Sequence, residues 1–131
     1  MSTSQASTKL NIANQPMTDR ELLESAAKAI WLKIDKSATN GGGEGNEGFD
    51  LMGNVMLDWH NNVKWNPLSD DGDALRLAVK LGLKIETPKY KGFGSTCGNQ
   101  TVFRDDPFEQ TRRAIVRAAA SIGETYNHSV P

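Results

Sequence analysis

Three stretches of the chain space their apolar residues three or four positions apart, which places those residues on one face of an α-helix. The predicted helices begin at Thr18, at Ser69 or Asp70, and at Asp106, and the last two end at Gly82 and Gly123. Their expected buried faces are Leu22, Leu23, Ala26, Ala27 and Ile30, then Ala74, Leu75, Ala78, Val79 and Leu81, then Phe108, Thr111, Ile115, Ala118, Ala119 and Ile122.

Shorter apolar runs between the helices predict strands. Strands are expected over 83–86 and 101–104, with one or two within 49–59, including 55–59. Residues 31–34 are interpreted either as a short strand or as a continuation of the first helix. The glycines at positions 92, 94 and 98 predict a loop or a loose hairpin, and residues 37–48, with five glycines, predict a flexible loop.

Each helix has a single apolar face, so all three must bury it against a small sheet. We therefore predict an α/β (α+β) fold, a layered helix/sheet/helix sandwich with about four strands and three helices. A chain of 131 residues suffices for one core. The single domain is expected over 17–123, after a flexible N-terminal extension at 1–16 that is rich in Ser, Thr, Asn and Gln, and before a frayed tail at 124–131.

Charge and cysteine content narrow the function classes. Fifteen basic and sixteen acidic side chains leave a net charge of −1, so no whole-molecule field attracts nucleic acid or a membrane, and we expect neither as a partner. The single cysteine, Cys97, forms no internal disulfide, and the sequence contains no apolar signal core or 18-residue apolar run. These observations predict a protein of the reducing cytoplasm.

The sequence contains few candidates for chemistry. Asp70, Asp71 and Asp73 could attract a hard cation, but their place at a helix start favours capping, and we predict no metal. No motif of a known nucleophile surrounds Cys97, and the glycines of 41–48 lack the Lys-Ser/Thr of a phosphate loop. We therefore predict no catalytic residue and no cofactor, and the chain is more consistent with a binding protein than with an enzyme.

Two groups of residues are candidate contact surfaces. Trp59, His60 and Trp65 could anchor a partner, since Trp is enriched in interfaces, although core packing is the favoured alternative for the tryptophans. The basic face of the last helix could contact phosphates or an acidic partner, although a solvated helix face is the favoured alternative; it consists of Arg112, Arg113 and Arg117.

Three blocks of sequence resemble the phage ABA sandwich domain family: MTDRELLESAAKA from position 17, WNPLSDDGDALRLAVKL from position 65 and RRAIVRAAASIG from position 112. The resemblance implies a helix/sheet/helix sandwich. It also implies an accessory protein of a bacteriophage or prophage, present in the cytoplasm of the bacterial host. It implies no activity and no site residues.

The leading hypothesis is a non-enzymatic protein that binds a host or phage macromolecule, with an unidentified protein partner and a homodimer as expected assemblies. The first alternative is a binder of a small molecule or nucleotide, or a minor enzyme, that uses the glycine-rich loops at 37–48 and 91–100. The second is a weak nucleic-acid binder that uses the arginine face of the last helix.

Overall fold

The computed structural model of the chain describes residues 16–38 and 47–129. Nearly all of the expected N-terminal extension and most of the glycine-rich loop at 37–48 lie outside the described residues. The elements are α2 (Asp19–Ala29), β1 (Val55–Asp58), β2 (Val63–Trp65), α3 (Asp71–Leu81), β3 (Ile85–Glu86), β4 (Ser95–Cys97), β5 (Gln100–Val102) and α4 (Pro107–Ser129). The predicted α+β class is confirmed.

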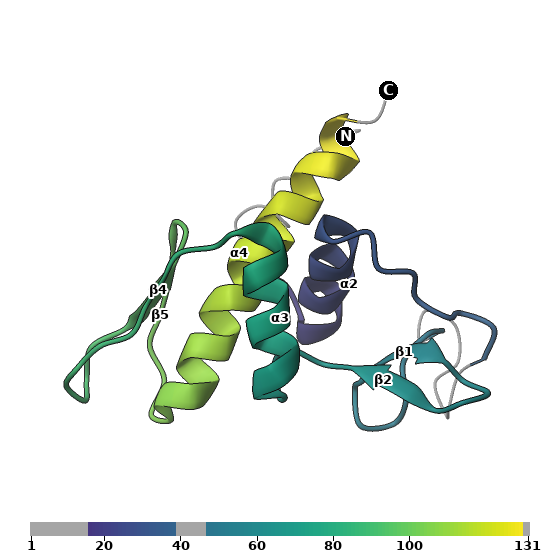
Figure 1. Cartoon of the computed structure of the whole chain (residues 1–131), viewed down its shortest axis with the longest axis horizontal. Helices are drawn as coiled ribbons and strands as arrows, with labels where there is room; N and C mark the ends of the chain where they lie inside the picture. The colour runs from purple at the N-terminus through teal and green to yellow at the C-terminus, as the bar shows by residue number, and fades with distance from the viewer. Residues whose placement is uncertain (1–15, 39–46, 130–131) are drawn as a thin grey trace, which may run out of the picture.

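Helices and sheets lie in layers, with the three helices between two small antiparallel sheets (Figure 1). In the first sheet β1 pairs with β2, with Val55 opposite Trp65. The second has the strand order β3-β4-β5, with Cys97 between Ile85 and Gln100. The strands are thus divided between two sheets, where the pattern suggested one. Helix α4 connects the parts, because it packs against α2, α3, β4 and β5.

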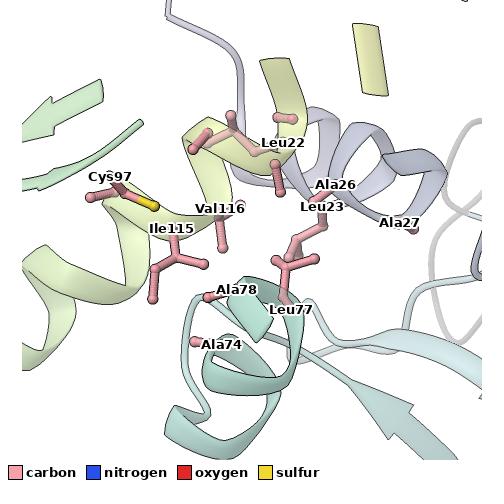
Figure 2. Packing of buried hydrophobic residues seen from close by; sticks show 14 of the residues in the cluster. Leu22, Leu23, Ala26, Ala27, Ala74, Leu77, Ala78, Cys97, Ile115 and Val116 are labelled. Atoms are coloured by element: carbon pink, nitrogen blue, oxygen red, sulfur yellow. The ribbon is translucent and has the colours of Figure 1, made fainter. Parts of the chain in front are cut away.

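The core lies where the helices meet. Leu23 of α2 and Leu77 of α3 point toward each other beside Val116 of α4 (Figure 2). Much of the remaining core is small, and includes Ala26, Ala27, Ala74, Ala78, Ala114, Ala118, Ala119 and Ala120. Small residues let helix backbones approach closely, so these helices pack tightly with few large side chains.

The expected buried faces of the last two helices need correction. Leu75 and Val79 of α3 and Phe108 of α4 are exposed, whereas Leu77 and Val116 are buried. Helix α3 has apolar residues on more than one side, so its sequence is compatible with two orientations. Contact with α4 selects the side that carries Leu77.

The predicted helix starts are confirmed in atomic detail. The Thr18 hydroxyl accepts from the Glu21 amide at 3.2 Å, and the Glu21 carboxylate accepts from the Thr18 amide at 2.8 Å. Asp70 caps α3 by accepting from the Asp73 amide at 2.8 Å, and Gly82 ends that helix in the left-handed conformation. These contacts satisfy backbone groups that a helix end leaves without partners.

Residues 31–34 form neither a strand nor a continuation of the helix. Trp31 adopts φ 58° directly after α2, and the Leu32 amide donates to the Ala27 carbonyl at 2.9 Å. This is the hydrogen-bond pattern of a Schellman C-terminus, normally built with glycine. The Trp31 ring stacks on Tyr126, with the ring centres 5.4 Å apart.

Strands β2 and β4 were not predicted as separate strands. Each has only three residues, and Val63 and Lys64 of β2 are exposed, so the sequence shows no clear alternation there. Pairing with β1 and with β3 and β5 forms these strands.

The predicted end of the third helix at Gly123 is wrong, because α4 continues to Ser129. Gly123 is buried inside the helix, where an added Cβ would lie 1.8 Å from the Ser25 carbonyl oxygen of α2. The next residue, Glu124, accepts a hydrogen bond from the Ser25 hydroxyl. The glycine therefore permits contact between two helix backbones.

Replacing Gly123 tests this close approach. Gly123→Ala should lower the free energy of unfolding by about 3 kcal/mol, because the new methyl group meets a backbone atom that cannot rotate away. Urea denaturation followed by circular dichroism measures the change. Gly72→Ala is the matched control: its Cβ would meet mainly the flexible Arg76 side chain, so the variant should be neutral or up to about 1 kcal/mol more stable. Equal effects of the two variants would contradict the proposed role of Gly123.

Candidate functional site

The structure separates the three residues predicted as partner anchors. Trp65 is 7% exposed and belongs to the core, which corrects its use as an anchor and agrees with the favoured alternative of core packing. Trp59 is half-buried, and His60 is exposed beside it in the turn between β1 and β2. Only Trp59 and His60 therefore present surface to a partner.

Trp59 has a structural partner in Asp35. The indole Nε1 donates to the Asp35 carbonyl oxygen at 3.0 Å, and the Trp59 amide donates to its carboxylate at 2.9 Å. Hydrogen bonds from the Ser37 hydroxyl and from the amides of Trp59 and Ser37 lower the pKa of the Asp35 carboxyl. This set of contacts attaches the segment after α2 to the end of β1.

The arginines of the predicted basic face make contacts within the fold. Arg112 donates to the Leu68 carbonyl oxygen at 2.8 Å and to Asp71 at 2.7 Å, and Arg113 donates to Asp19 at 2.9 Å. These two side chains are largely buried and join α4 to the starts of α3 and α2. They are thus less available to a phosphate than their sequence spacing suggests.

Arg117 differs from the other two arginines because no carboxylate among the residues that the structure describes pairs with it. Burial, followed by the charges of Arg104 and Arg113, lowers the pKa of its guanidinium. Arg117, in the middle of α4, therefore lies in a locally positive environment.

The acidic cluster at the start of α3 is used within the fold. Asp70 caps the helix, Asp71 pairs with Arg112, and Asp73 accepts from the Asn66 amide at 2.8 Å and from Arg76 at 2.8 Å. Across the part of the chain that the structure describes, no three His, Cys, Asp or Glu side chains come together as a metal site.

Cys97 is buried beneath α4, and burial raises the pKa of its thiol. A raised pKa disfavours the thiolate, which is the reactive form. His60 belongs to the other sheet, across the helices from β4, so these two residues do not form a nucleophilic pair (Figure 1).

A cleft of about 320 Å³ lies where the loop after β3 faces the start of α4. We call it the loop cleft. It is lined by Pro88, Lys89, Tyr90, Lys91, Gly92 and Phe93 on the loop and by Arg104, Asp105, Pro107 and Gln110 around the helix start. The sequence prediction named the 91–100 loop as a binding segment, and its first three residues line the cleft.

Gln110 holds both sides of the loop cleft in place. Its side chain is 3% exposed, accepts from the Arg104 amide at 2.8 Å, and donates to the Phe93 carbonyl oxygen at 3.0 Å and to the Ser95 hydroxyl at 2.9 Å. Ser95 in turn contacts the Thr111 hydroxyl at 2.7 Å. A buried polar network with satisfied partners defines one geometry, so the cleft is a built feature of the fold.

Four aromatic residues in or next to the segments that line the loop cleft are exposed: Tyr90 66%, Phe93 62%, Phe103 62% and Phe108 65%. Tyr90 and Phe93 line it, and Phe103 and Phe108 each adjoin a lining residue in the chain. The Phe103 ring lies over Gly94, where an added Cβ would come within 2.9 Å of it. We call these four rings the aromatic rim.

Comparison with models of known protein families, with curated proteins and with solved structures found no match. The resemblance to the phage ABA sandwich domain family therefore stays a prediction. No helix in the described segments is both long enough and apolar enough to cross a membrane.

The sequence analysis missed the aromatic rim as a group. Phe108 was assigned to the helix core, and Tyr90, Phe93 and Phe103 are spread over two loops. A usable signal was present in KYKGF at 89–93, where two lysines and two aromatic residues alternate in a segment with neither helical nor strand spacing.

The Asp35 contacts predict a pH dependence of stability. Because the folded-state pKa of Asp35 is lowered, its stabilising effect is complete above the unfolded value of about 3.9 and is lost as the pH falls through the folded pKa. The stability difference between the parent protein and Asp35→Asn should therefore shrink as the pH falls below about 4. Chemical denaturation across this range measures it.

A second variant separates the hydrogen bonds from the charge alone. Ser37→Ala keeps the Asp35 carboxylate and removes a donor, so the carboxyl should titrate at higher pH in a ¹³C NMR titration. An unchanged titration midpoint would contradict the assigned cause.

The Gln110 network predicts coupling between the two walls of the loop cleft. Gln110→Ala should lower the free energy of unfolding by about 2 kcal/mol, because it leaves buried polar groups without partners. The Arg104 amide should also exchange with solvent faster. Gln100→Ala is the control and should cost under about 0.5 kcal/mol, since among the described residues the side-chain amide of Gln100 donates to Asn99 alone. Unchanged exchange at Arg104 in Gln110→Ala would refute the coupling.

Proposed function

We propose that the protein is a non-enzymatic binding protein that contacts a macromolecule through the aromatic rim and the loop cleft. One observation carries the proposal: Tyr90 and Phe93, each more than 60% exposed, line one cleft, and the equally exposed Phe103 ring lies over Gly94, which adjoins Phe93. Exposing large apolar rings to water costs free energy, and exposed apolar patches on folded proteins mark interaction sites. The rim therefore has the character of a surface that a partner covers.

The non-enzymatic part of the proposal is supported by how the reactive groups are used. Cys97 is buried with a raised thiol pKa, and the carboxylates of Asp70, Asp71 and Asp73 cap or pair with groups of the fold. Among the described residues that line the loop cleft, Asp105 is the single carboxylate, and the lining contains no His or Cys.

The origin as a phage or prophage accessory protein in the cytoplasm of a bacterial host belongs to the same proposal, and rests on the sequence resemblance alone. A bacterial lysate is accordingly the appropriate source of partners. A homodimer also stays a prediction, which size-exclusion chromatography with light scattering tests directly.

A second candidate function is a binder of a small molecule or nucleotide. The observation that favours it is that Lys91, Gly92 and Phe93, from one of the two glycine-rich loops first considered, line the loop cleft. Both candidates use the same surface, and they differ in the size of the ligand.

Capture from a bacterial lysate tests the proposed function. The parent chain should retain a macromolecule that the double variant Tyr90→Ser with Phe103→Ser loses by about tenfold or more, as expected when interface anchors are removed. Mass spectrometry and nucleic-acid quantification, each with and without nuclease, measure what is retained.

The control is Leu75→Ser with Val79→Ser, which removes two equally exposed apolar side chains from α3. It should retain the same material as the parent. Loss of capture in both double variants, or in neither, would refute the aromatic rim as the binding surface.

A further inference from the structure

The loop cleft contains both aromatic rings and positively charged side chains, and this combination indicates the class of ligand that it binds. Lys89, Lys91 and Arg104 line it together with Tyr90 and Phe93. We propose that the cleft binds single-stranded nucleic acid, with a base stacked on Tyr90 or Phe93 and phosphates on the two lysines. This inference rests on the proposed function and specifies its partner.

The two lysines are available to an anion. Lys89 and Lys91 are exposed on either side of Tyr90, and within the described residues neither has a carboxylate partner. Lys89 lies over the Tyr90 ring at 6.0 Å, so charge and ring form one surface. Arg104 on the facing wall is held by Glu109 at 3.7 Å and by the Phe103 carbonyl oxygen at 2.9 Å.

Carboxylates are confined to the helix wall of the cleft. Asp105 lines it, Asp106 accepts from the Phe108 amide at 2.9 Å, and Glu109 pairs with Arg104. The loop wall has no acidic residue between positions 88 and 93. A phosphate is therefore expected on the loop wall.

The rings supply stacking surfaces that suit bases of any sequence. Base-on-ring stacking contributes to single-strand binding without reading sequence, because every base has a flat face. Tyr90 and Phe93 line the cleft, and the exposed Phe103 ring lies over Gly94, next to Phe93 in the chain. Rings that continue past the cleft favour a strand with successive bases over a lone nucleotide.

The size and the elements involved exclude a duplex as the preferred ligand. A volume of about 320 Å³ is at the lower end of ligand pockets and suits a single flat unit. Duplex DNA is read by helices or strands that enter a groove, whereas these cations lie on a loop beside a recess.

A protein partner is less consistent with the same residues. The centres of protein interfaces are depleted of lysine, yet here two lysines flank the central tyrosine. The overall charge of −1 argued against nucleic acid for the whole molecule, but binding to a strand depends on the local groups that the cleft brings together.

Fluorescence anisotropy with the full chain tests the inference. The probe is a labelled single strand of about 16 nucleotides, the upper end of common single-strand site sizes, as DNA and as RNA. Binding should weaken with salt, with a slope of log K against log salt of about −1.4, because each of the two phosphates neutralised by the lysines on a single strand contributes about −0.7. The same strand annealed to its complement, and adenosine monophosphate as competitor, should bind at least tenfold more weakly.

Matched variants separate charge from stacking. Lys89→Gln with Lys91→Gln should reduce the slope to near zero, because both cations assigned to phosphates are removed. Lys33→Gln with Lys80→Gln removes the same charge from exposed sites outside the cleft and should bind like the parent.

Tyr90→Leu should weaken binding about tenfold at unchanged slope, since it removes a ring and no charge. Trp31→Leu, an exposed ring outside the cleft, should have no effect.

The outcomes distinguish this inference from the proposed function. No binding of the strand, or equal effects of the two lysine pairs, overturns the inference. Equal binding of the duplex overturns it too, and equal binding of adenosine monophosphate assigns the cleft to a free nucleotide. Rim-dependent capture from the lysate that resists nuclease, with no strand binding, leaves the proposed function standing with a protein partner. Absence of both results refutes both proposals.

Discussion

The rest of this fold depends on the close approach of the backbones of α2 and α4 at Ser25 and Gly123. A side chain at position 123 would occupy the space of the Ser25 carbonyl, so the two helices lie together only because that position has no Cβ. The rest of the core follows from this distance: alanines fill the space between the helices, and Leu23, Leu77 and Val116 close it from three sides (Figure 2). Because α4 also packs on α3 and on β4 and β5, its placement positions α2, α3 and the second sheet relative to one another.

The loop cleft depends on the same helix at its other end. The first turns of α4 present Gln110 to the interior, and its amide holds the Arg104 and Phe93 backbones on opposite walls. The aromatic rim surrounds a recess whose floor is therefore rigid, while its rings and lysines face solvent. A rigid base beneath exposed, chemically mixed side chains suits binding, because less ordering free energy is lost when a ligand arrives.

The sequence pattern correctly predicted the features that depend on contacts within a few residues. Thr18 with Glu21, Asp70 with Asp73, and Gly82 mark helix ends through contacts within a few residues, and all three are where the sequence placed them. The sequence pattern did not predict the features that depend on contacts between segments distant in the chain. Val79 and Leu77 are equally apolar in sequence, and only contact with α4 decides which is buried. Strands of three residues, such as β2 and β4, form because a partner strand is present.

The sequence by itself therefore determined the α+β class, the three helices and their caps, since these depend on spacing and on neighbours in the chain. The sequence suggested that Gly123 ends a helix, but in the folded protein Gly123 lies inside α4 and contacts α2. Only the tertiary structure reveals this, because the Ser25 carbonyl that it approaches is distant in sequence. The tertiary structure likewise decided that Arg112 and Arg113 join helices, and that Tyr90 and Phe93 face the start of α4 across one cleft. The physical reason is the same in each case: burial and pairing are properties of surfaces that meet only after the chain has folded.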